Sequence, residues 1–369
     1  MQRRVFAKVL GAGAALLPAA AAGSAAREGI KVGVITHAGG AHLDAYFSAL
    51  AEADEVAAVS LSDPGRQNVD AAREALGEKL IAVYGEPATL VREQRPVMAL
   101  VSMEAALAPP AIEVALRAGC HVMAEKPACV RIEDFERLHE IAKTNDLHLM
   151  LALANRLNPE AREARRLIGE GMMGKIYGVE AHLIADQTRL TRPAYHETWY
   201  AEKARGGGGH LIWLGIHWLD LTTFLTDSDI VEVAGFTGVV GGQPLDVEDS
   251  AAIAMKFANG AFGTMTSGYY LDRGYHSHIK IWGSHGWLEV RRHGGLPLSW
   301  YSRKEQDSRI HRIDRFPGPS GYTPFVKACV RASAGLEEPP LTVDDSLQAL
   351  RTVFGCYRAA QTGRAQRLG

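Results

Sequence analysis

The feature that most restricts the fold of this chain is a regular alternation of short apolar runs with amphipathic segments. The apolar runs occupy residues 30–35, 56–63, 97–103, 120–127 and 147–153. The longer segments between them include residues 42–53, 69–77, 109–119 and 131–146. Runs of the first kind predict buried strands and those of the second predict helices. Strands separated by helices form right-handed β-α-β units. The pattern therefore predicts an N-terminal α/β domain with a parallel, doubly wound sheet.

The pattern of apolar and polar residues changes after residue 155. It predicts helices at residues 158–171, 210–225, 322–335 and 343–362, an irregular segment at 186–209, and strands at 174–185, 230–240, 250–258, 261–270, 276–283 and 286–292. Turn signals such as "ANGA" and "GSHG" separate the later strands. This order predicts an α+β C-terminal domain with a large, mostly antiparallel open sheet.

The first 26 residues have the anatomy of a cleavable signal peptide, with a basic start, an apolar run and small residues before Arg27. Arg3-Arg4, followed by Phe6 and Lys8, is similar to a twin-arginine export signal. An uncleaved membrane anchor is the alternative, but the run is weakly apolar and short for a bilayer span. We expect a periplasmic or otherwise exported protein with no membrane contact after cleavage.

Charge and cysteine content exclude several functions. The formal net charge is −2, so no basic surface predicts a nucleic-acid partner. The 4 cysteines show no C-x-x-C spacing, which favours buried thiols over a metal site or a disulfide framework.

The stretch "GVITHAGGAHL" lies where the first strand meets the first helix, which is where such folds bind a pyrophosphate. Its glycines are displaced from the usual G-x-G-x-x-G spacing. The candidate cofactor-binding residues of this loop are Thr36, His37, Ala38, Gly39 and Gly40. An ordinary β-α turn is the alternative.

Asp63 ends the second predicted strand, where an acidic side chain accepts hydrogen bonds from ribose hydroxyls and repels a 2′-phosphate. This position favours NAD over NADP, although Arg66 leaves the phosphorylated form possible. The alternative role for Asp63 is to cap the turn that begins at Pro64.

Glu125-Lys126-Pro127 lies at the carboxyl end of a predicted parallel strand, facing the crevice where ligands bind. Lys126 there can stabilise an oxygen on which negative charge develops, and Pro127 restricts the backbone through a trans or a cis bond. A surface lysine before a turn is the alternative.

The stretch "GGGGHLIWLGIHWLD" places His210, His217 and Asp220 on one face of a predicted helix. A histidine near neutrality is a natural general base for an alcohol. The pattern has two alternative interpretations: a metal site built from the three residues, and a purely structural His217.

Taken together, these motifs resemble the Gfo/Idh/MocA family, named for glucose–fructose oxidoreductase and inositol dehydrogenase. The resemblance covers residues 30–362 and also includes "IGEGMMGKIYGVEA", "EDSAAIAMKFANGAFG", "IWGSHGWLEV" and "DDSLQALRTVFGCYRAAQTGR". It implies a Rossmann domain, a second domain whose open sheet mediates oligomerisation, Lys126 as the active-site lysine and His217 as the catalytic acid/base. It also implies that Glu125 and Pro127 border the cofactor.

The chain departs from the family pattern at Trp213, which stands where an aspartate four residues before the histidine is usual. An indole there can stack on a sugar ring. With His210, Asp220 and Trp199, it completes the set of candidate substrate-binding residues. Tyr195 and Tyr200 also suggest a ring-shaped ligand.

The resemblance leads to three functional hypotheses. The first is an exported NAD(P)-dependent oxidoreductase acting on CH–OH groups of a sugar or polyol. The others are an NAD-dependent redox glycosidase that recycles its cofactor and a non-catalytic carbohydrate-binding protein. We expect tightly bound NAD, with NADP possible, no metal, a carbohydrate-like small molecule as ligand, and a homodimer or homotetramer.

The sequence thus divides into four parts. They are a signal peptide (1–26), an NAD(P)-binding Rossmann domain (27–150), a substrate and oligomerisation domain (151–340) and a C-terminal helix packing back on the Rossmann domain (341–369).

Overall fold

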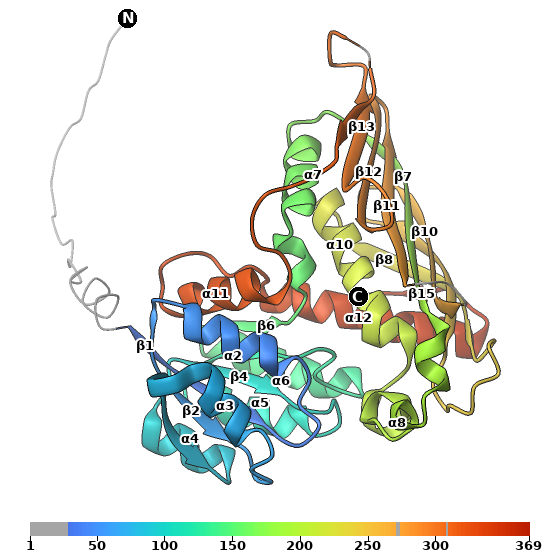
Figure 1. Cartoon of the computed structure of the whole chain (residues 1–369). Coiled ribbons are helices and arrows are strands. Elements are labelled where there is room, and N and C mark those ends of the chain that lie inside the picture. The colour runs from blue at the N-terminus through green and yellow to red at the C-terminus, as the bar shows by residue number, and fades with distance from the viewer. Residues whose placement is uncertain (1–28, 271–273, 308) are drawn as a thin grey trace, which may run out of the picture.

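The computed structural model describes residues 29–270, 274–307 and 309–369, so the expected signal peptide lies outside the described residues. Two layered regions are visible (Figure 1). The N-terminal half of the chain forms a parallel sheet between helices, and the C-terminal half forms a larger sheet with helices against one face. The predicted fold class is therefore confirmed.

The N-terminal sheet contains six parallel strands in the order β3-β2-β1-β4-β5-β6. Its strands are β1 (Ile30–Thr36), β2 (Val56–Ser62), β3 (Leu80–Tyr84), β4 (Met98–Ser102), β5 (His121–Ala124) and β6 (Leu149–Leu151). The sequence pattern missed β3. This strand lies at the sheet edge and has no fully buried residue, so it lacks the apolar run that marks the others.

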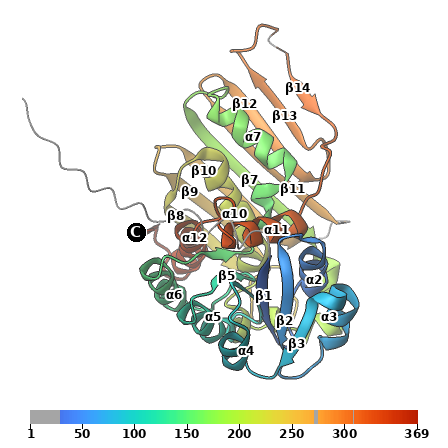
Figure 2. The ribbon, with the colours of Figure 1, turned by 90° about the vertical axis from the view of Figure 1, so that its left-hand side faces the viewer.

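Helices cover both faces of this sheet, as Figure 2 shows: α2 and α3 lie on one side and α4, α5 and α6 on the other. They are α2 (Leu43–Glu52), α3 (Val69–Leu76), α4 (Pro87–Gln94), α5 (Ala108–Arg117) and α6 (Ile132–Thr144), with a short turn η1 (Gly77–Lys79) after α3. The strand order reverses between β1 and β4, and ligands of such sheets bind at the carboxyl ends of the strands at this reversal.

The C-terminal sheet contains nine strands in the order β14-β13-β12-β11-β7-β10-β9-β8-β15. They are β7 (Ile176–Asp186), β8 (Ile230–Gly238), β9 (Ser250–Phe257), β10 (Phe262–Tyr270), β11 (Tyr275–Gly283), β12 (Gly286–His293), β13 (Leu298–Ser302), β14 (His311–Ile313) and β15 (Gln366–Arg367). Neighbouring strands are antiparallel except β7 and β10, which pair in parallel.

Four longer helices accompany this sheet. They are α7 (Pro159–Gly169), α10 (Ile216–Thr226), α11 (Tyr322–Ser333) and α12 (Val343–Thr362). α11 packs beside α2, and α12 runs between α6 of the first region and β8 of the second. A capping box between Thr342 and Asp345 starts α12. No helix in the described part of the chain is long and apolar enough to cross a membrane.

The segment expected to be irregular contains several short helical turns. They are η3 (Gln187–Thr191), α8 (Pro193–His196), η4 (Trp199–Ala201) and α9 (Lys203–Gly206), followed by a π-helical turn, η5 (Leu211–Gly215), that leads into α10. A further turn, η2 (Ala154–Leu157), connects β6 to α7. These turns bring aromatic side chains of the second region against the first.

Candidate active site

Lys126 follows β5 at the carboxyl edge of the parallel sheet and is buried, with 1% exposure. Its peptide bond to Pro127 is cis. The ammonium Nζ donates a hydrogen bond to the backbone oxygen of Trp213 at 2.7 Å and lies 3.2 Å from the centroid of the Trp213 ring. Burial lowers the pKa of Lys126 to about 7, although the Glu125 carboxylate opposes this shift. The side chain can therefore exchange a proton near neutral pH, and the surface-lysine alternative is wrong.

The Glu125 carboxylate lies close to the Lys126 ammonium and contacts two side chains of the first region. Its Oε2 accepts hydrogen bonds from the Tyr46 hydroxyl and from His42 Nδ1, the latter at 3.0 Å, while Oε1 lies 3.9 Å from Lys126 Nζ. Burial, followed by the charge of Glu125, raises the pKa of Tyr46 well above its usual value, so the phenol stays a neutral donor. Glu125 therefore ties β5 to α2 through these contacts.

His217 lies on α10 and is 8% exposed. Its Nδ1 is buried without a hydrogen-bond partner among the described residues. Burial holds the pKa of His217 well below its usual value, and the charge of Lys126 lowers it further. The imidazole is consequently neutral and able to accept a proton, and the Coulomb interaction places it within electrostatic reach of the Lys126 ammonium.

Trp213 does not offer an open face to a sugar ring, because it is 7% exposed and its surroundings are filled by the protein itself. Tyr200 stacks on it with ring centroids 4.7 Å apart, and Trp199 meets it edge-on at 5.1 Å. Lys126 lies over the same ring. The expected stacking role is therefore corrected: the indole holds the lysine through a cation–π contact.

The loop after β1 is packed against its neighbours. The Thr36 hydroxyl donates to the backbone oxygen of Ser102 at 2.7 Å, so it ties β1 to β4 and is not a free donor for a phosphate. Within the loop, His37 Nδ1 accepts from the Gly39 backbone N–H at 3.1 Å. A Cβ on Gly40 would lie 2.1 Å from Thr36 Oγ1, so this connection requires glycine. Ala38 lies between His37 and Gly39, which are joined by this side-chain hydrogen bond.

Trp199 covers this loop from the second region. Its indole Nε1 donates to the Gly39 backbone oxygen at 2.8 Å, and the side chain is 4% exposed. A Cβ on Gly39 would approach the Trp199 ring to 3.0 Å. The segment that carries Trp199 is thus closed over the loop.

Asp63 provides the best test of whether the residues fit a dinucleotide. It is 0% exposed. Its Oδ2 accepts from the Asn68 backbone N–H at 2.7 Å and from the Asn68 side-chain amide at 3.2 Å, which is the expected turn-capping role. Its Oδ1 is buried and has no hydrogen-bond partner among the described residues. A buried carboxylate oxygen left without a donor fits ribose hydroxyls at the end of the second strand.

His210 and Asp220 do not join His217, although all three were expected on one helix face. His210 is 0% exposed, and its Nδ1 pairs with the Ser267 hydroxyl at 2.7 Å. Burial lowers its pKa to about 3, so it belongs to the protein core. Asp220 accepts three hydrogen bonds from the Arg156 guanidinium, the shortest of 2.6 Å. The π-helical turn shifts His210 relative to α10, so the three side chains do not converge on one position in this structure.

The pair Arg156–Asp220 should be structural. Replacing Asp220 with Asn is expected to lower the free energy of unfolding by about 3 kcal/mol, because a buried guanidinium loses its main counter-charge. Urea unfolding measures this change. The matched control is Asp227→Asn, which removes an exposed ion pair with Arg165 and should change stability by less than about 1 kcal/mol. Equal effects of the two variants would contradict the assignment.

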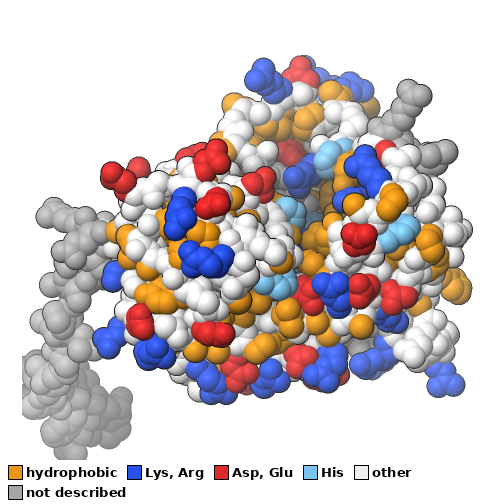
Figure 3. Space-filling view, turned by 60° about the horizontal axis from the view of Figure 1, so that its bottom comes forward, with side chains coloured by type: hydrophobic (Ala, Val, Ile, Leu, Met, Phe, Trp, Pro, Cys, Tyr) orange, Lys and Arg blue, Asp and Glu red, His pale blue; other side chains and the backbone are white. Residues whose placement is uncertain are grey.

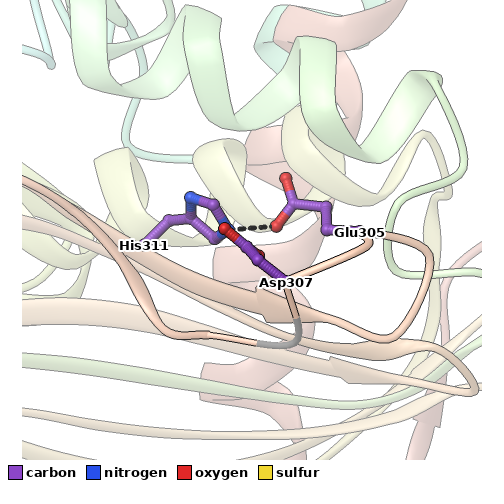
Figure 4. A group of neighbouring side chains, drawn as sticks. All are labelled: Glu305, Asp307 and His311. Carbon is purple, nitrogen blue, oxygen red and sulfur yellow. Dashed lines mark ion pairs between the residues drawn. The ribbon is translucent and has the colours of Figure 1, made fainter.

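One group of metal-ligand atoms was found in the described part of the chain: Glu305, Asp307 and His311, in the connection between β13 and β14 (Figure 4). Their ligand atoms lie within 4.8 Å of one another. Arg309 pairs with Asp307 at 2.6 Å and His311 stacks on Trp300, so these side chains have protein partners. The group is distant in the fold from Lys126 and does not contribute to this site.

Comparisons with known protein families agree with this geometry. The family described as an oxidoreductase family with an NAD-binding Rossmann fold matches residues 30–153. The family described as the GFO/IDH/MocA C-terminal domain matches residues 161–289. The two matches follow the two layered regions of the structure.

Similar proteins include two that are named as dehydrogenases. The chain is 29% identical over 184 residues to D-xylose 1-dehydrogenase [NADP(+)] of Haloarcula marismortui. This match covers 49% of this chain and 49% of the relative, so the chain spans about half the length of that relative. It is 22% identical over 326 residues to myo-inositol 2-dehydrogenase of Thermotoga maritima, covering 85% of this chain and 92% of the relative.

Solved structures share the fold. An oxidoreductase domain protein from Kribbella flavida has a TM-score of 0.80 at 23% identity, over 93% of this chain and 100% of that one. An oxidoreductase from Agrobacterium radiobacter in complex with NAD+, L-tartaric acid and magnesium has a TM-score of 0.79 at 17% identity, over 92% and 98%. At these identities the likeness establishes the architecture alone.

Proposed function

This chain belongs to the GFO/IDH/MocA family of oxidoreductases, and from that premise we propose that it is an exported NAD(P)-dependent enzyme that acts on a hydroxyl group of a sugar, a polyol or a related substrate. The observation that carries the proposal is the buried Lys126 at the carboxyl end of β5, with the neutral His217 within its electrostatic reach. Sugar and polyol dehydrogenases among the relatives support the substrate class.

The two side chains divide the proton chemistry between them. In the oxidative direction, His217 accepts the hydroxyl proton, because its imidazole is neutral and Nδ1 lacks a partner. Lys126 donates a charge-assisted hydrogen bond to the substrate oxygen with the N–H groups that Trp213 leaves free. A bound nicotinamide would supply the hydride acceptor. Exclusion of water by the aromatic side chains around Lys126 strengthens this hydrogen bond.

The first test is a search for bound cofactor. The folded, mature protein is purified, denatured, and the released small molecules are examined by mass spectrometry. Stoichiometric NAD or NADP would support the proposal. A protein that released neither nucleotide, and bound neither when they were added, would support a carbohydrate-binding protein without catalysis.

Asp63 should set the cofactor preference. Replacing Asp63 with Asn removes the negative charge and keeps the side-chain shape, so the turn to Asn68 is preserved. NADH affinity should fall by about tenfold, because an amide NH2 group then replaces Oδ1 and cannot accept from a ribose hydroxyl, and NADPH affinity should fall less or rise. Fluorescence titration with both nucleotides measures the ratio. An unchanged ratio of the two affinities would show that Asp63 only caps its turn.

The closed position of Trp199 favours one second candidate. A segment that covers the Gly39 loop would retain a cofactor between turnovers, which suits a glycosidase that oxidises its sugar transiently and then reduces the product. Turnover of aryl glycosides without added NAD would support this reaction over net dehydrogenation. A strict need for added NAD would exclude it.

Export and assembly are further parts of the proposal. Export rests on the N-terminal 26 residues, and a fusion of these residues to a reporter that folds in the cytoplasm tests it. A homodimer or homotetramer rests on exposed aromatic side chains along the C-terminal sheet. They are Tyr177 (57% exposed), Phe236 (79%), Phe262 (65%) and Trp282 (37%). Light scattering on the purified protein measures the assembly.

A further inference from the structure

A cavity of about 340 Å³ lies beside β12 and the segment that precedes α11, and the proposed reaction does not account for it. Its volume is in the range of pockets that hold a small ligand. Its lining combines three arginines with two carboxylates and a histidine: Arg291, Arg292, Arg315, Glu160, Asp314 and His293. In the space-filling view, histidine and basic side chains also gather around a hollow in the visible surface (Figure 3).

Arg292, at the end of β12, reaches across to the parallel-sheet region. Its Nη1 donates a hydrogen bond to the side-chain oxygen of Asn155, in the turn that follows β6. This bond fixes which end of the Asn155 amide is the oxygen. The NH2 end of the same amide is buried and has no hydrogen-bond partner among the described residues, although Asn155 is only 2% exposed. Buried donors are rarely left unpaired, so an acceptor is missing at this position.

The guanidinium of Arg292 also has no ion-pair partner among the described residues. Within the described ranges, no carboxylate lies at ion-pair distance from it, whereas the neighbouring Arg291 pairs with Glu289 and the nearby Arg156 pairs with Asp220. Glu160 lines the same cavity; burial raises its pKa and the charge of Arg292 opposes this rise, so the two side chains interact without forming an ion pair. A guanidinium without an ion-pair partner lines the cavity, and the amide that it contacts has an NH2 group without an acceptor; both groups prefer oxygen atoms that carry negative charge.

Arg292 lies near the helix that carries His217, because the adjacent His293 stacks with Trp218 of α10 at a ring-centroid distance of 6.5 Å. The charge of Arg292 contributes, after burial and Lys126, to the lowered pKa of His217, and after burial to that of His293, which falls to about 4. Arg292 also acts on Tyr322, whose ring lies against His42 of the first region. The guanidinium is therefore within electrostatic reach of His217 while it lines the cavity.

We infer that the substrate carries an oxyanion, either a carboxylate or a phosphate, which binds to Arg292 and to the amide NH2 group of Asn155 while the reacting hydroxyl lies at His217. Only the position of the reacting hydroxyl at His217 rests on the proposed function. A polyhydroxy acid or a sugar phosphate has the required chemistry, with a hydroxyl-bearing carbon chain and one anionic end. Arg292 is then a residue that determines substrate specificity.

The test is a binding measurement by calorimetry on the purified, full mature protein, with and without added NAD. The probes are D-gluconate, D-glucitol and D-glucose 6-phosphate, because the first two differ only at the carbon that carries the charge. D-gluconate or D-glucose 6-phosphate should bind at least about tenfold more tightly than D-glucitol. In Arg292→Gln this difference should disappear, and Arg292→Lys should restore part of it. The matched control is Arg312→Gln, an exposed arginine on β14 outside the cavity, which should leave all three affinities unchanged.

Each outcome decides the inference without reference to turnover. Tighter binding of gluconate assigns a carboxylate, and tighter binding of the phosphate ester assigns a phosphate. Equal affinity for D-glucitol and both anions, absence of binding at millimolar concentration, or an unchanged preference in Arg292→Gln would overturn the inference. Anion binding through Arg292 in a protein that never reduces NAD would overturn the proposed function and support the inference.

Discussion

Replacing His217 with Ala is expected to lower kcat/KM for hydride transfer by about 10²- to 10⁴-fold, because the neutral base that accepts the hydroxyl proton is lost. The native fold should persist, since Nδ1 makes no hydrogen bond that the substitution would remove. Steady-state kinetics with any substrate found by screening measures the loss, and added imidazole should restore part of the activity.

The pH dependence makes this prediction sharper. The pKa of His217 lies well below its usual value, so the imidazole is the free base at neutral pH. Its titration should therefore not reduce the activity of the parent enzyme between pH 6 and 8. His139→Ala is the matched control, because His139 pairs with Asp344 on the outer side of α6. Near-normal turnover of His217→Ala would remove His217 from the mechanism.

Replacing Lys126 with Met is expected to lower kcat by about 10²- to 10³-fold, since the charged donor to the developing alkoxide is lost. The parent enzyme should also lose activity as the pH rises above about 7, where the ammonium gives up its proton. This alkaline limb should be missing in Lys126→Met. Lys304→Met, at an exposed position after β13, is the control for kinetics and stability.

Lys126→Met should lose activity but gain free energy of unfolding. The pKa of Lys126 is lowered from 10.5 to about 7 in the folded protein, so the unfolded chain binds more protons between these values. The buried lysine is therefore most destabilising below pH 7, and its effect fades as the pH approaches 10.5. The gain in unfolding free energy in Lys126→Met should be larger at pH 6 than at pH 9. A gain that is the same at both pH values would show that the pKa of Lys126 is not lowered.

Most of the fold could be predicted from local sequence. The strands β1, β2, β4, β5 and β6 are apolar runs between amphipathic helices, and burial on both faces of a parallel sheet requires that composition. The edge strand β3 could not be recognised, because its residues are only partly buried. The turns η3 and η4 were missed since short helical turns carry no periodic signal.

The site was predictable where one element determines the position of a residue. Lys126 follows a recognisable buried strand, and its position at the carboxyl edge follows from the parallel topology. His210 and Asp220 were misassigned because their partners, Ser267 on β10 and Arg156 in η2, come from distant elements. Arg292 and Asn155 were missed because neither stands in a motif, and only their contact leaves the amide donor without an acceptor.

By itself, then, the sequence determined most of the order of strands and helices, the two layered regions and the edge at which Lys126 lies, because these follow from short-range hydrophobic periodicity. The tertiary structure alone decided what the residues at that edge can do. Lys126 acquires its lowered pKa and its contact with Trp213 from a segment 87 residues away, and His217 becomes neutral because elements from both regions bury it. Burial and charge are sums over neighbours in space, and a local pattern does not contain those neighbours.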